Sequence, residues 1–169
     1  MIKSSNIILN NILLTGGAGY IGSHISVYLI KKGFNVTIFD SFINSRRFIL
    51  EKIKNLIKIQ NSKNLKNLET VEGDIRDLNS LRKLFDRSKQ NKKPFNAVIH
   101  LAGLKQVANS VNKPLEYWEN NVFGSINLLK VMDENNCRTI IFSSSATIYE
   151  KSSAANIKES FSINPTNPY

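Results

Sequence analysis

Short apolar runs alternate with longer amphipathic segments along this chain. The runs are rich in aliphatic and β-branched side chains and predict buried strands at residues 12–14, 36–39, 70–72, 97–101 and 139–143. Between them, apolar residues recur at spacings of three and four and predict helices at residues 21–32, 48–57, 78–85 and 114–135. Strands that alternate with helices form βαβ units. The pattern therefore predicts an α/β fold, a Rossmann-type doubly wound parallel sheet that ends after about five strands.

Three details of this pattern concern how the helices face, begin and end. The first predicted helix is expected to bury an apolar face of Ile21, Ile25, Tyr28 and Leu29. Pro114 is suited to the first turn of the long helix, and Asn112 is a candidate for its N-cap. Residues 55–67 are polar and rich in asparagine, so we expect a helix end followed by a loop there.

Composition limits the class of protein. The chain has 169 residues, of which 41% are hydrophobic and one is a cysteine. This hydrophobic share is too high for a disordered chain, and a single cysteine excludes both a disulfide framework and a four-cysteine zinc site. The apolar stretches are far shorter than the roughly 18 residues of a membrane span. We therefore expect residues 1–169 to form one domain of a soluble cytoplasmic protein, with no membrane partner.

The formal net charge of +10 raises the question of a nucleic-acid partner. The chain has 17 lysines against 6 arginines, and this excess accompanies 22 asparagines and 21 isoleucines spread over the whole sequence. A joint excess of these three residue types is typical of a coding bias. A phosphate-binding stripe would instead concentrate charge and favour arginine. The charge therefore predicts no nucleic-acid partner.

A glycine-rich segment, TGGAGYIG at residues 15–22, lies between the first predicted strand and the first predicted helix. It satisfies G-x-G-x-x-G with Gly17, Gly19 and Gly22, and G-x-x-G-x-x-G when Gly16 replaces Gly17. Glycine allows a tight turn and a close approach of the backbone to a pyrophosphate, whose charge is attracted by the helix N-terminus. A purely structural glycine turn is the alternative, but the strand–turn–helix context favours a dinucleotide site.

Two aspartates follow later strands at positions that a dinucleotide would reach. Asp40 ends the second strand, 18 positions after Gly22. A carboxylate there accepts a hydrogen bond from a ribose 2′-hydroxyl and repels a 2′-phosphate, which favours NAD over NADP. An ordinary strand-end aspartate is one alternative, and the arginines at 46–47 keep NADP as another. Asp74 is a candidate contact for the adenine edge, with a helix cap as its alternative.

Six motifs together resemble one enzyme family. They are TGGAGYIGSH (15–24), DSFINS (40–45), GDIR (73–76), LAGLK (101–105), KPLEY followed by NNV and glycine (113–124), and SSSATIY (143–149). Over essentially its whole length, the chain is similar to the UDP-glucose 4-epimerases of the extended short-chain dehydrogenase/reductase family. The segment 113–124 is the most specific of these motifs, whereas Ser41 stands where that family usually has asparagine.

The resemblance implies a set of site residues. The implied NAD contacts are Gly16, Gly19, Tyr20, Ile21 and Gly22 at the pyrophosphate, Asp40, Ser41, Asn44, Ser45, Asp74 and Ile75 at the adenosine, and Leu101, Ala102, Gly103, Leu104, Lys105 and Asn120 elsewhere. The implied catalytic residues are Ser145 and Tyr169. The implied contacts of the UDP-sugar substrate are Ser145, Ala146 and Thr147.

The resemblance also implies the chemistry. The tyrosine takes the proton of the sugar 4-hydroxyl while C4 passes hydride to NAD⁺, and the transient 4-keto sugar turns before hydride returns to its other face. The family's lysine, four residues after Tyr169, lies beyond this sequence. We therefore expect an incomplete NAD-binding domain that is inactive as an epimerase by itself. In the family, the long helix contributes to a homodimer interface, half of which this chain lacks.

Other functions stay open as alternatives. Dehydratases of the same superfamily carry an acidic pair directly after the catalytic serine or threonine, where this chain has Ala146 and Thr147 after Ser145. Epimerases for other UDP-sugars, a non-catalytic NAD-binding module and a split-gene fragment are not excluded, because the residues that size the sugar pocket are expected outside this sequence. No metal site is predicted, since His24 and His100 have no metal-like partners and are expected to be packing or hydrogen-bonded residues. Cys137 lacks the setting of a nucleophile and is expected to be structural.

Overall fold

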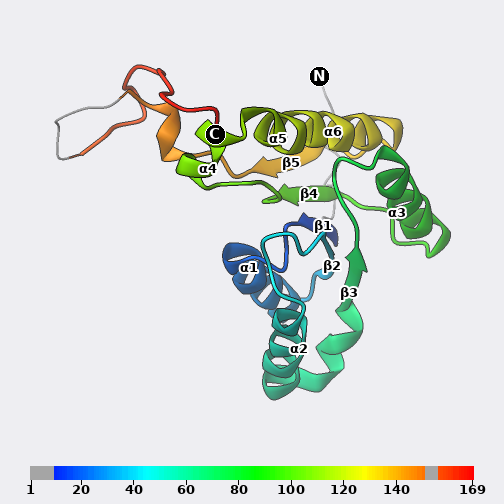
Figure 1. The fold of residues 1–169 in the computed structure, drawn as a ribbon. Helices are drawn as coiled ribbons and strands as arrows, with labels where there is room; N and C mark the ends of the chain where they lie inside the picture. Colours follow the sequence, from blue (N-terminus) through cyan, green and yellow to red (C-terminus); the bar gives the residue numbers. More distant parts are fainter. Residues whose placement is uncertain (1–9, 151–155) are drawn as a thin grey trace, which may run out of the picture.

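A computed structural model describes residues 10–150 and 156–169, and Figure 1 shows a central sheet with helices on both faces. The strands are β1 (Asn11–Thr15), β2 (Asn35–Asp40), β3 (Leu68–Glu72), β4 (Ala97–His100) and β5 (Thr139–Phe142). All pair in parallel, in the order β3-β2-β1-β4-β5. The predicted Rossmann-type doubly wound sheet is therefore confirmed, and the strand order reverses between the neighbouring strands β1 and β4.

The helices form one layer on each face of the sheet. The longer helices are α1 (Tyr20–Lys31), α2 (Phe48–Asn61), α3 (Leu78–Gln90) and α6 (Gly124–Glu134). The shorter elements are η1 (Ser62–Asn67), α4 (Val107–Asn112), α5 (Pro114–Tyr117), η2 (Trp118–Phe123) and η3 (Ala146–Ile148). Helix α1 packs beside α2 on one face, and α3 packs beside α6 on the other.

Alternating side chains along the strands fill two separate cores. Leu13 and Val98 face α3 and α6, in a cluster that includes Leu128. Leu14 lies in the second cluster with Ile53 of α2. Successive strand residues point to opposite faces, so a strand that is covered on both faces must be apolar throughout. This requirement explains the short continuous apolar runs in the sequence.

The buried face of α1 differs from the predicted one. Gly22, Ser26 and Ile30 are its buried residues, whereas Ile21 and Tyr28 are 54% and 60% exposed. Because Gly22 and Ser26 are small, the helix can approach the sheet closely, and Ile21 and Tyr28 are left facing solvent. The predicted apolar face is therefore correct at Ile25 and Leu29, which pack partly buried against the second core, and wrong at Ile21 and Tyr28.

Two helix boundaries also differ from the predictions. Helix α2 continues through Asn61 and passes directly into η1, so the loop expected within residues 55–67 is wrong. Asn61 instead caps η1, because its side chain accepts a hydrogen bond from the Lys63 N–H. Asn112 is the last residue of α4, a helix that the sequence pattern does not predict, and no side-chain cap precedes Pro114.

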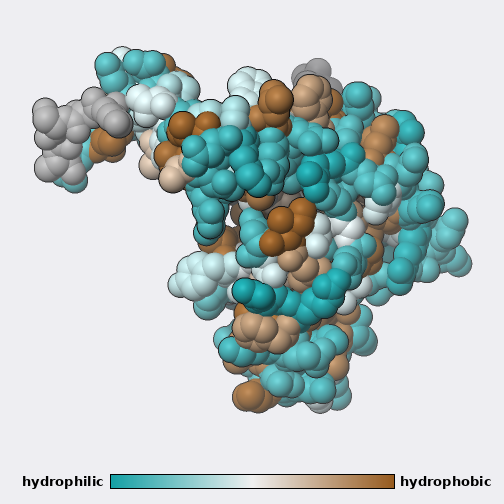
Figure 2. Space-filling model, in the orientation of Figure 1, coloured by the Kyte–Doolittle hydropathy of each residue, from teal (hydrophilic) through white to brown (hydrophobic). Residues whose placement is uncertain are grey.

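Strand β5 forms one end of the sheet in the described part of the chain and pairs with β4. Its residues Ile141 and Phe142 are 59% and 60% exposed, so apolar side chains face solvent at this edge. Elsewhere, Figure 2 shows a mainly hydrophilic surface with apolar side chains in small separate patches. Of the helices in residues 10–150 and 156–169, none is long and apolar enough to cross a membrane.

Candidate functional site

The glycine-rich turn between β1 and α1 packs against the ends of two neighbouring strands. Gly16 has a φ of 70°, and its N–H donates to the Phe39 carbonyl in β2 over 2.9 Å. A Cβ atom at Gly16 would lie 2.6 Å from the backbone nitrogen of Ala102, just after β4. A Cβ atom at Gly22 would lie 2.6 Å from the Gly16 carbonyl oxygen. Both positions therefore require glycine, and the turn is pressed against β2 and against the segment after β4.

The N-terminus of α1 is open to an anion. Its N-cap is Gly19, which has no side chain to occupy the free N–H groups, and no acidic residue lies in the first turn. Gly17 and Ala18 are buried, whereas Gly16 and Gly19 are half-buried and Tyr20 is 78% exposed, so solvent reaches the turn at Gly16 and at its helix end. The positive end of a 12-residue helix, next to a turn without bulky side chains, is suited to a pyrophosphate.

Asp40 joins the glycine turn to the loop after β2. Its Oδ2 accepts a hydrogen bond from the Ala18 N–H at 2.9 Å. Its Oδ1 accepts from the Phe42 N–H at 2.9 Å and from the Ser45 hydroxyl at 2.8 Å. The residue is buried, so these three donors hold the carboxylate in one orientation. Because a carboxylate oxygen can accept two hydrogen bonds, Oδ2 retains acceptor capacity for a further donor such as a ribose hydroxyl.

The loop that begins at Ser41 reaches the segment after β4. The Asn44 side-chain amide donates to the Gly103 carbonyl at 3.2 Å. Segments 41–45 and 101–105, which are far apart in the sequence, are thereby brought together beside the glycine turn. The structure thus assembles three of the predicted cofactor segments at the carboxyl ends of β1, β2 and β4, where open α/β sheets bind their ligands.

Asp74 is held by Arg76 and does not cap a helix. Its carboxylate accepts from the Arg76 N–H at 2.8 Å and from the guanidinium at 2.6 Å. These hydrogen bonds hold the pKa of the Asp74 carboxyl below its ordinary value. The N-cap of α3 is Asp77, whose side chain accepts two backbone N–H groups of the first turn. The alternative role of Asp74 as a helix cap is therefore wrong. Next to it, Ile75 is buried against Gly124.

The long helix approaches the segment after β4 at η2, which is one turn of π-helix. Asn121 clamps the backbone of Leu104: its Nδ2 donates to the Leu104 carbonyl and its Oδ1 accepts from the Leu104 N–H, both at 2.8 Å. The buried Asn120, an expected cofactor residue, donates to the same Oδ1 at 2.8 Å. Sequence reasoning missed Asn121, although the pair of consecutive asparagines in the family-specific motif was an available signal.

A buried histidine links this helix to the glycine turn. Nδ1 of His100 lies 2.6 Å from the Thr15 hydroxyl, and Nε2 lies 2.9 Å from the Ser125 hydroxyl. The Ser125 hydroxyl donates to the Asn121 carbonyl at 2.5 Å, so Nε2 carries the proton and Nδ1 accepts from Thr15. Burial lowers the pKa of His100 to about 4, which keeps the ring neutral at pH 7. The sequence predicts a packed or hydrogen-bonded histidine here, but not this connection.

The predicted catalytic residues lie after β5. The Ser145 hydroxyl lies 2.8 Å from the Thr147 hydroxyl and accepts from the Thr147 N–H at 3.1 Å, which fixes the start of η3 at Ala146. The ring of Tyr169 meets the ring of Tyr117 edge-on, with centroids 6.5 Å apart. In Figure 1 the C-terminus accordingly lies beside α4 and α5. Within the described residues, no hydrogen bond joins Ser145 to Tyr169.

The residues that the structure covers show neither a metal-ion site nor a nucleophilic thiol. Among them, no group of three or more His, Cys, Asp or Glu side chains is placed to hold a metal ion. Cys137 is buried, and its burial raises the pKa of the thiol. A buried thiol with a raised pKa is a poor nucleophile, so the structural role expected for Cys137 fits this setting.

Comparison with known proteins bears on this arrangement. Residues 13–169 match the model of the family described as GDP-mannose 4,6 dehydratase. The chain belongs to this family. It is similar to the bifunctional UDP-glucose 4-epimerase and UDP-xylose 4-epimerase 1 of Pisum sativum, with 45% identity over 169 residues. These residues are 100% of this chain and 45% of the Pisum protein.

Solved structures show the same relationship. The UDP-glucose 4-epimerase of Bifidobacterium longum, in complex with NAD⁺ and UDP, is 37% identical with a TM-score of 0.82, over 95% of this chain and 44% of that one. The UDP-glucose-4-epimerase of Stenotrophomonas maltophila, with bound NAD and formylated UDP-arabinopyranose, is 36% identical with a TM-score of 0.81, over the same shares. The resemblance expected from the motifs is confirmed, and the chain spans less than half the length of these relatives.

Proposed function

We propose that this chain is the NAD-binding part of a UDP-glucose 4-epimerase, an isomerase that interconverts UDP-glucose and UDP-galactose in galactose metabolism. The observation that carries the proposal is the cradle formed by the glycine turn, the loop after Asp40 and the segment after β4. Relatives at 36–37% identity that were crystallised with NAD support the choice of cofactor.

The residues of the cradle fit NAD. Gly16 and Gly22 keep the turn free of side chains, and the open N-terminus of α1 offers N–H groups to the pyrophosphate. The fixed carboxylate of Asp40 accepts a ribose hydroxyl in this proposal. Residues 74–75 then meet the adenine, and residues 101–105 line the remainder of the cofactor together with Asn120.

The proposed chemistry divides between the cofactor and this chain's own residues. Bound NAD⁺ supplies a hydride acceptor and donor for the sugar. Tyr169 removes the proton of the sugar 4-hydroxyl, and Ser145 holds that hydroxyl by a hydrogen bond. A phenol with an ordinary pKa near 10 is only about 0.1% ionised at pH 7, so a base at this position needs a neighbouring cation. Ala146 and Thr147 border the sugar and leave room for it.

The residues after Ser145 favour an epimerase over a dehydratase, although the family is described by a dehydratase. Dehydratases of this superfamily place an acidic pair directly after the catalytic serine, and this chain has Ala146 and Thr147 there. Thr147 is engaged with Ser145 through its hydroxyl and its N–H. The names of the curated relatives, at 44–45% identity, agree with the epimerase assignment.

The exposed face of α5, η2 and α6 supports a homodimer of the whole protein. Exposed apolar residues recur there at spacings of three and four, namely Leu115, Trp118, Val122, Ile126 and Leu129. Apolar side chains are visible along the upper edge of Figure 2, over α5 and α6. A stripe of this spacing is suited to packing against another helix. Sedimentation of the whole protein tests this interface. The substitution Trp118→Glu should convert the dimer to a monomer, and an unchanged dimer would contradict the interface.

This chain covers less than half of its relatives' length, so cofactor binding and turnover of the sugar are tested separately. Because the chain matches 45% of the Pisum protein, we propose that these 169 residues alone bind NAD⁺ without turning over the sugar. Isothermal titration with NAD⁺, followed by an assay for UDP-galactose formed from UDP-glucose, checks both parts. Binding without epimerisation is expected. Epimerisation by this chain alone would contradict the division of labour, and a failure to bind NAD⁺ would contradict the cofactor role.

A further inference from the structure

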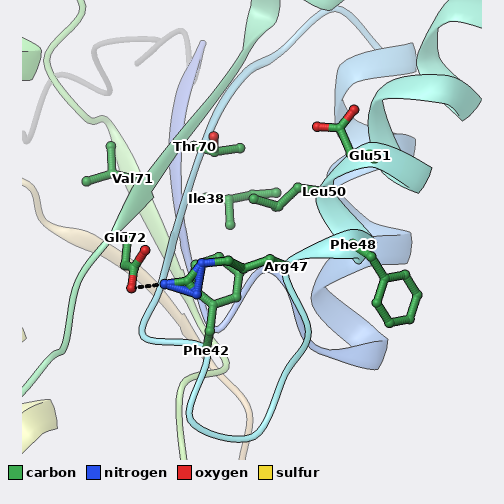
Figure 3. Close-up of a pocket in the computed structure, with 9 residues that line it drawn as sticks. All are labelled: Ile38, Phe42, Arg47, Phe48, Leu50, Glu51, Thr70, Val71 and Glu72. Atoms are coloured by element: carbon green, nitrogen blue, oxygen red, sulfur yellow. Dashed lines mark hydrogen bonds and ion pairs between the residues drawn. The ribbon is translucent and has the colours of Figure 1, made fainter.

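The wall of the cradle beyond Asp40 carries charged groups that the proposed NAD contacts do not use. Asp40 and Glu72 are direct partners in the parallel ladder between β2 and β3, so both lie at the carboxyl end of the sheet. The Glu72 side chain is 56% exposed, whereas Asp40 is buried. Figure 3 shows Glu72 with Arg47 and Phe42 at a groove of about 420 Å³ between α2 and β3.

Arg47 reaches from the start of α2 to the end of β3. Its guanidinium forms an ion pair with Glu72, and its Cζ lies 4.7 Å from the centre of the Phe42 ring. Phe42 has a φ of 57°, and its N–H donates to the Asp40 carboxylate at 2.9 Å. The guanidinium is therefore held against the loop that fixes Asp40, with Glu72 as its counter-ion.

This place in the fold decides which dinucleotide is accepted. A carboxylate at the end of the second strand accepts the ribose 2′-hydroxyl, and an arginine nearby accommodates a 2′-phosphate when the cofactor carries one. Arginine binds phosphate through its forked N–H donors. In this chain Glu72 occupies one donor nitrogen of Arg47, Nη2, and neutralises its charge. Glu72 also adds a negative charge, which repels a phosphate dianion at short range.

We propose that Glu72 is a specificity-determining residue, which withholds Arg47 from a 2′-phosphate and thereby keeps the site selective for NAD over NADP. The inference rests on the proposed NAD-binding function and adds a second determinant to Asp40. The neighbouring Arg46 is exposed and supplies the competing cation. A test must therefore distinguish the effect of Arg47 on NADP⁺ binding from that of Arg46.

Isothermal titration of the 169-residue chain with NAD⁺ and with NADP⁺ tests the proposal through the ratio of the two dissociation constants. Glu72→Gln is expected to lower the ratio Kd(NADP⁺)/Kd(NAD⁺) about tenfold, because it releases Arg47 and removes one negative charge. Glu72→Ala is expected to lower the ratio by a similar factor. Adding Arg47→Gln to Glu72→Gln should restore the wild-type ratio. A double variant that keeps the lowered ratio would overturn the role of Arg47.

Glu69→Gln is the matched control. Glu69 lies on the same strand, away from Asp40, and pairs with Arg87 at 2.7 Å. Its replacement is expected to leave the ratio unchanged. A ratio within about twofold of wild type in both Glu72 variants, with wild-type circular dichroism, would overturn the inference alone. A wild-type chain that does not bind NAD⁺ would overturn the proposed function together with it, so the two failures are distinguishable.

Discussion

The cofactor cradle and the segment with the catalytic candidates are built in different ways. The cradle lies at the ends of β1, β2 and β4, which are neighbours in the sheet, and its closest contacts join backbone atoms. The segment after β5 leaves the end of the sheet. Its bridge between Tyr149 and Ile163 and the backbone hydrogen bonds around it join parts of the segment to one another, and the ring of Tyr169 meets Tyr117 of α5. Within the described residues, many backbone contacts therefore fix the shape of the cradle, whereas few contacts hold the segment after β5 against the rest of the fold.

The largest effect should come from a side chain placed inside the cradle. Gly16→Val forces a β-branched residue to a φ of 70° and drives a Cβ to within 2.6 Å of the Ala102 nitrogen. We expect NAD⁺ binding to weaken at least about 100-fold, since the turn must move away from the segment after β4. Isothermal titration measures this change.

The control for this substitution is a second glycine with positive φ. Gly33 has a φ of 91°, and an added Cβ there meets nothing within 4 Å. Asparagine tolerates this conformation, so Gly33→Asn should bind NAD⁺ like wild type. A Gly16→Val chain that binds within about tenfold of wild type would show that the turn does not need to be closed against β4.

The next effect should appear as a pH dependence of stability. The pKa of His100 is about 4 in the folded chain and near 6.5 when unfolded, so the unfolded state binds more protons between these values. Stability should therefore be full above pH 7 and fall as the pH drops, by about 2.5 kcal/mol at pH 4.5. Urea denaturation across this range measures the loss. His100→Gln should flatten the dependence, and an equally steep profile in that variant would assign it to other groups.

Features that depend on residues close together in the sequence could be predicted, whereas features that depend on contacts between distant residues could not. The glycine turn, Asp40 and the interior strands have local determinants, namely spacing and continuous apolar runs, and these predictions of fold are confirmed. His100 bonds Thr15 and Ser125, which lie 85 and 25 positions away, so no local pattern reveals the link. The π-helical turn at Asn121 and the pairing of Arg47 with Glu72 likewise depend on tertiary packing.

A smaller effect is expected where the long helix supports the cradle. Asn121→Ala leaves the N–H and carbonyl of Leu104 without their partners, which should cost about 1–3 kcal/mol of unfolding free energy. The substitution should also weaken the binding of NAD⁺ more than the binding of ADP, because the Asn121 side chain positions the segment 101–105. Asn79→Ala on the exposed side of α3 is the control. Equal losses for NAD⁺ and ADP would show a general destabilisation and would contradict a positioning role.

The smallest effect on stability should come from the open edge at β5. Ile141 is 59% exposed, so Ile141→Lys should change the unfolding free energy by less than about 0.5 kcal/mol while reducing aggregation. Light scattering at rising protein concentration measures the difference. Leu56→Lys, at an exposed apolar position of α2, controls for added charge. Equal improvement in both variants would contradict a special role for the β5 edge.

The central claim is that NAD binds in a cradle that this chain builds by itself. Mapping the backbone amide chemical shifts of the labelled chain during titration with NAD⁺ tests it most directly. We predict the largest changes at Gly16–Gly22, at residues 40–45 and at residues 101–105, with small changes on the outer side of α3. No change, or changes confined to β5 and the residues after it, would contradict the claim.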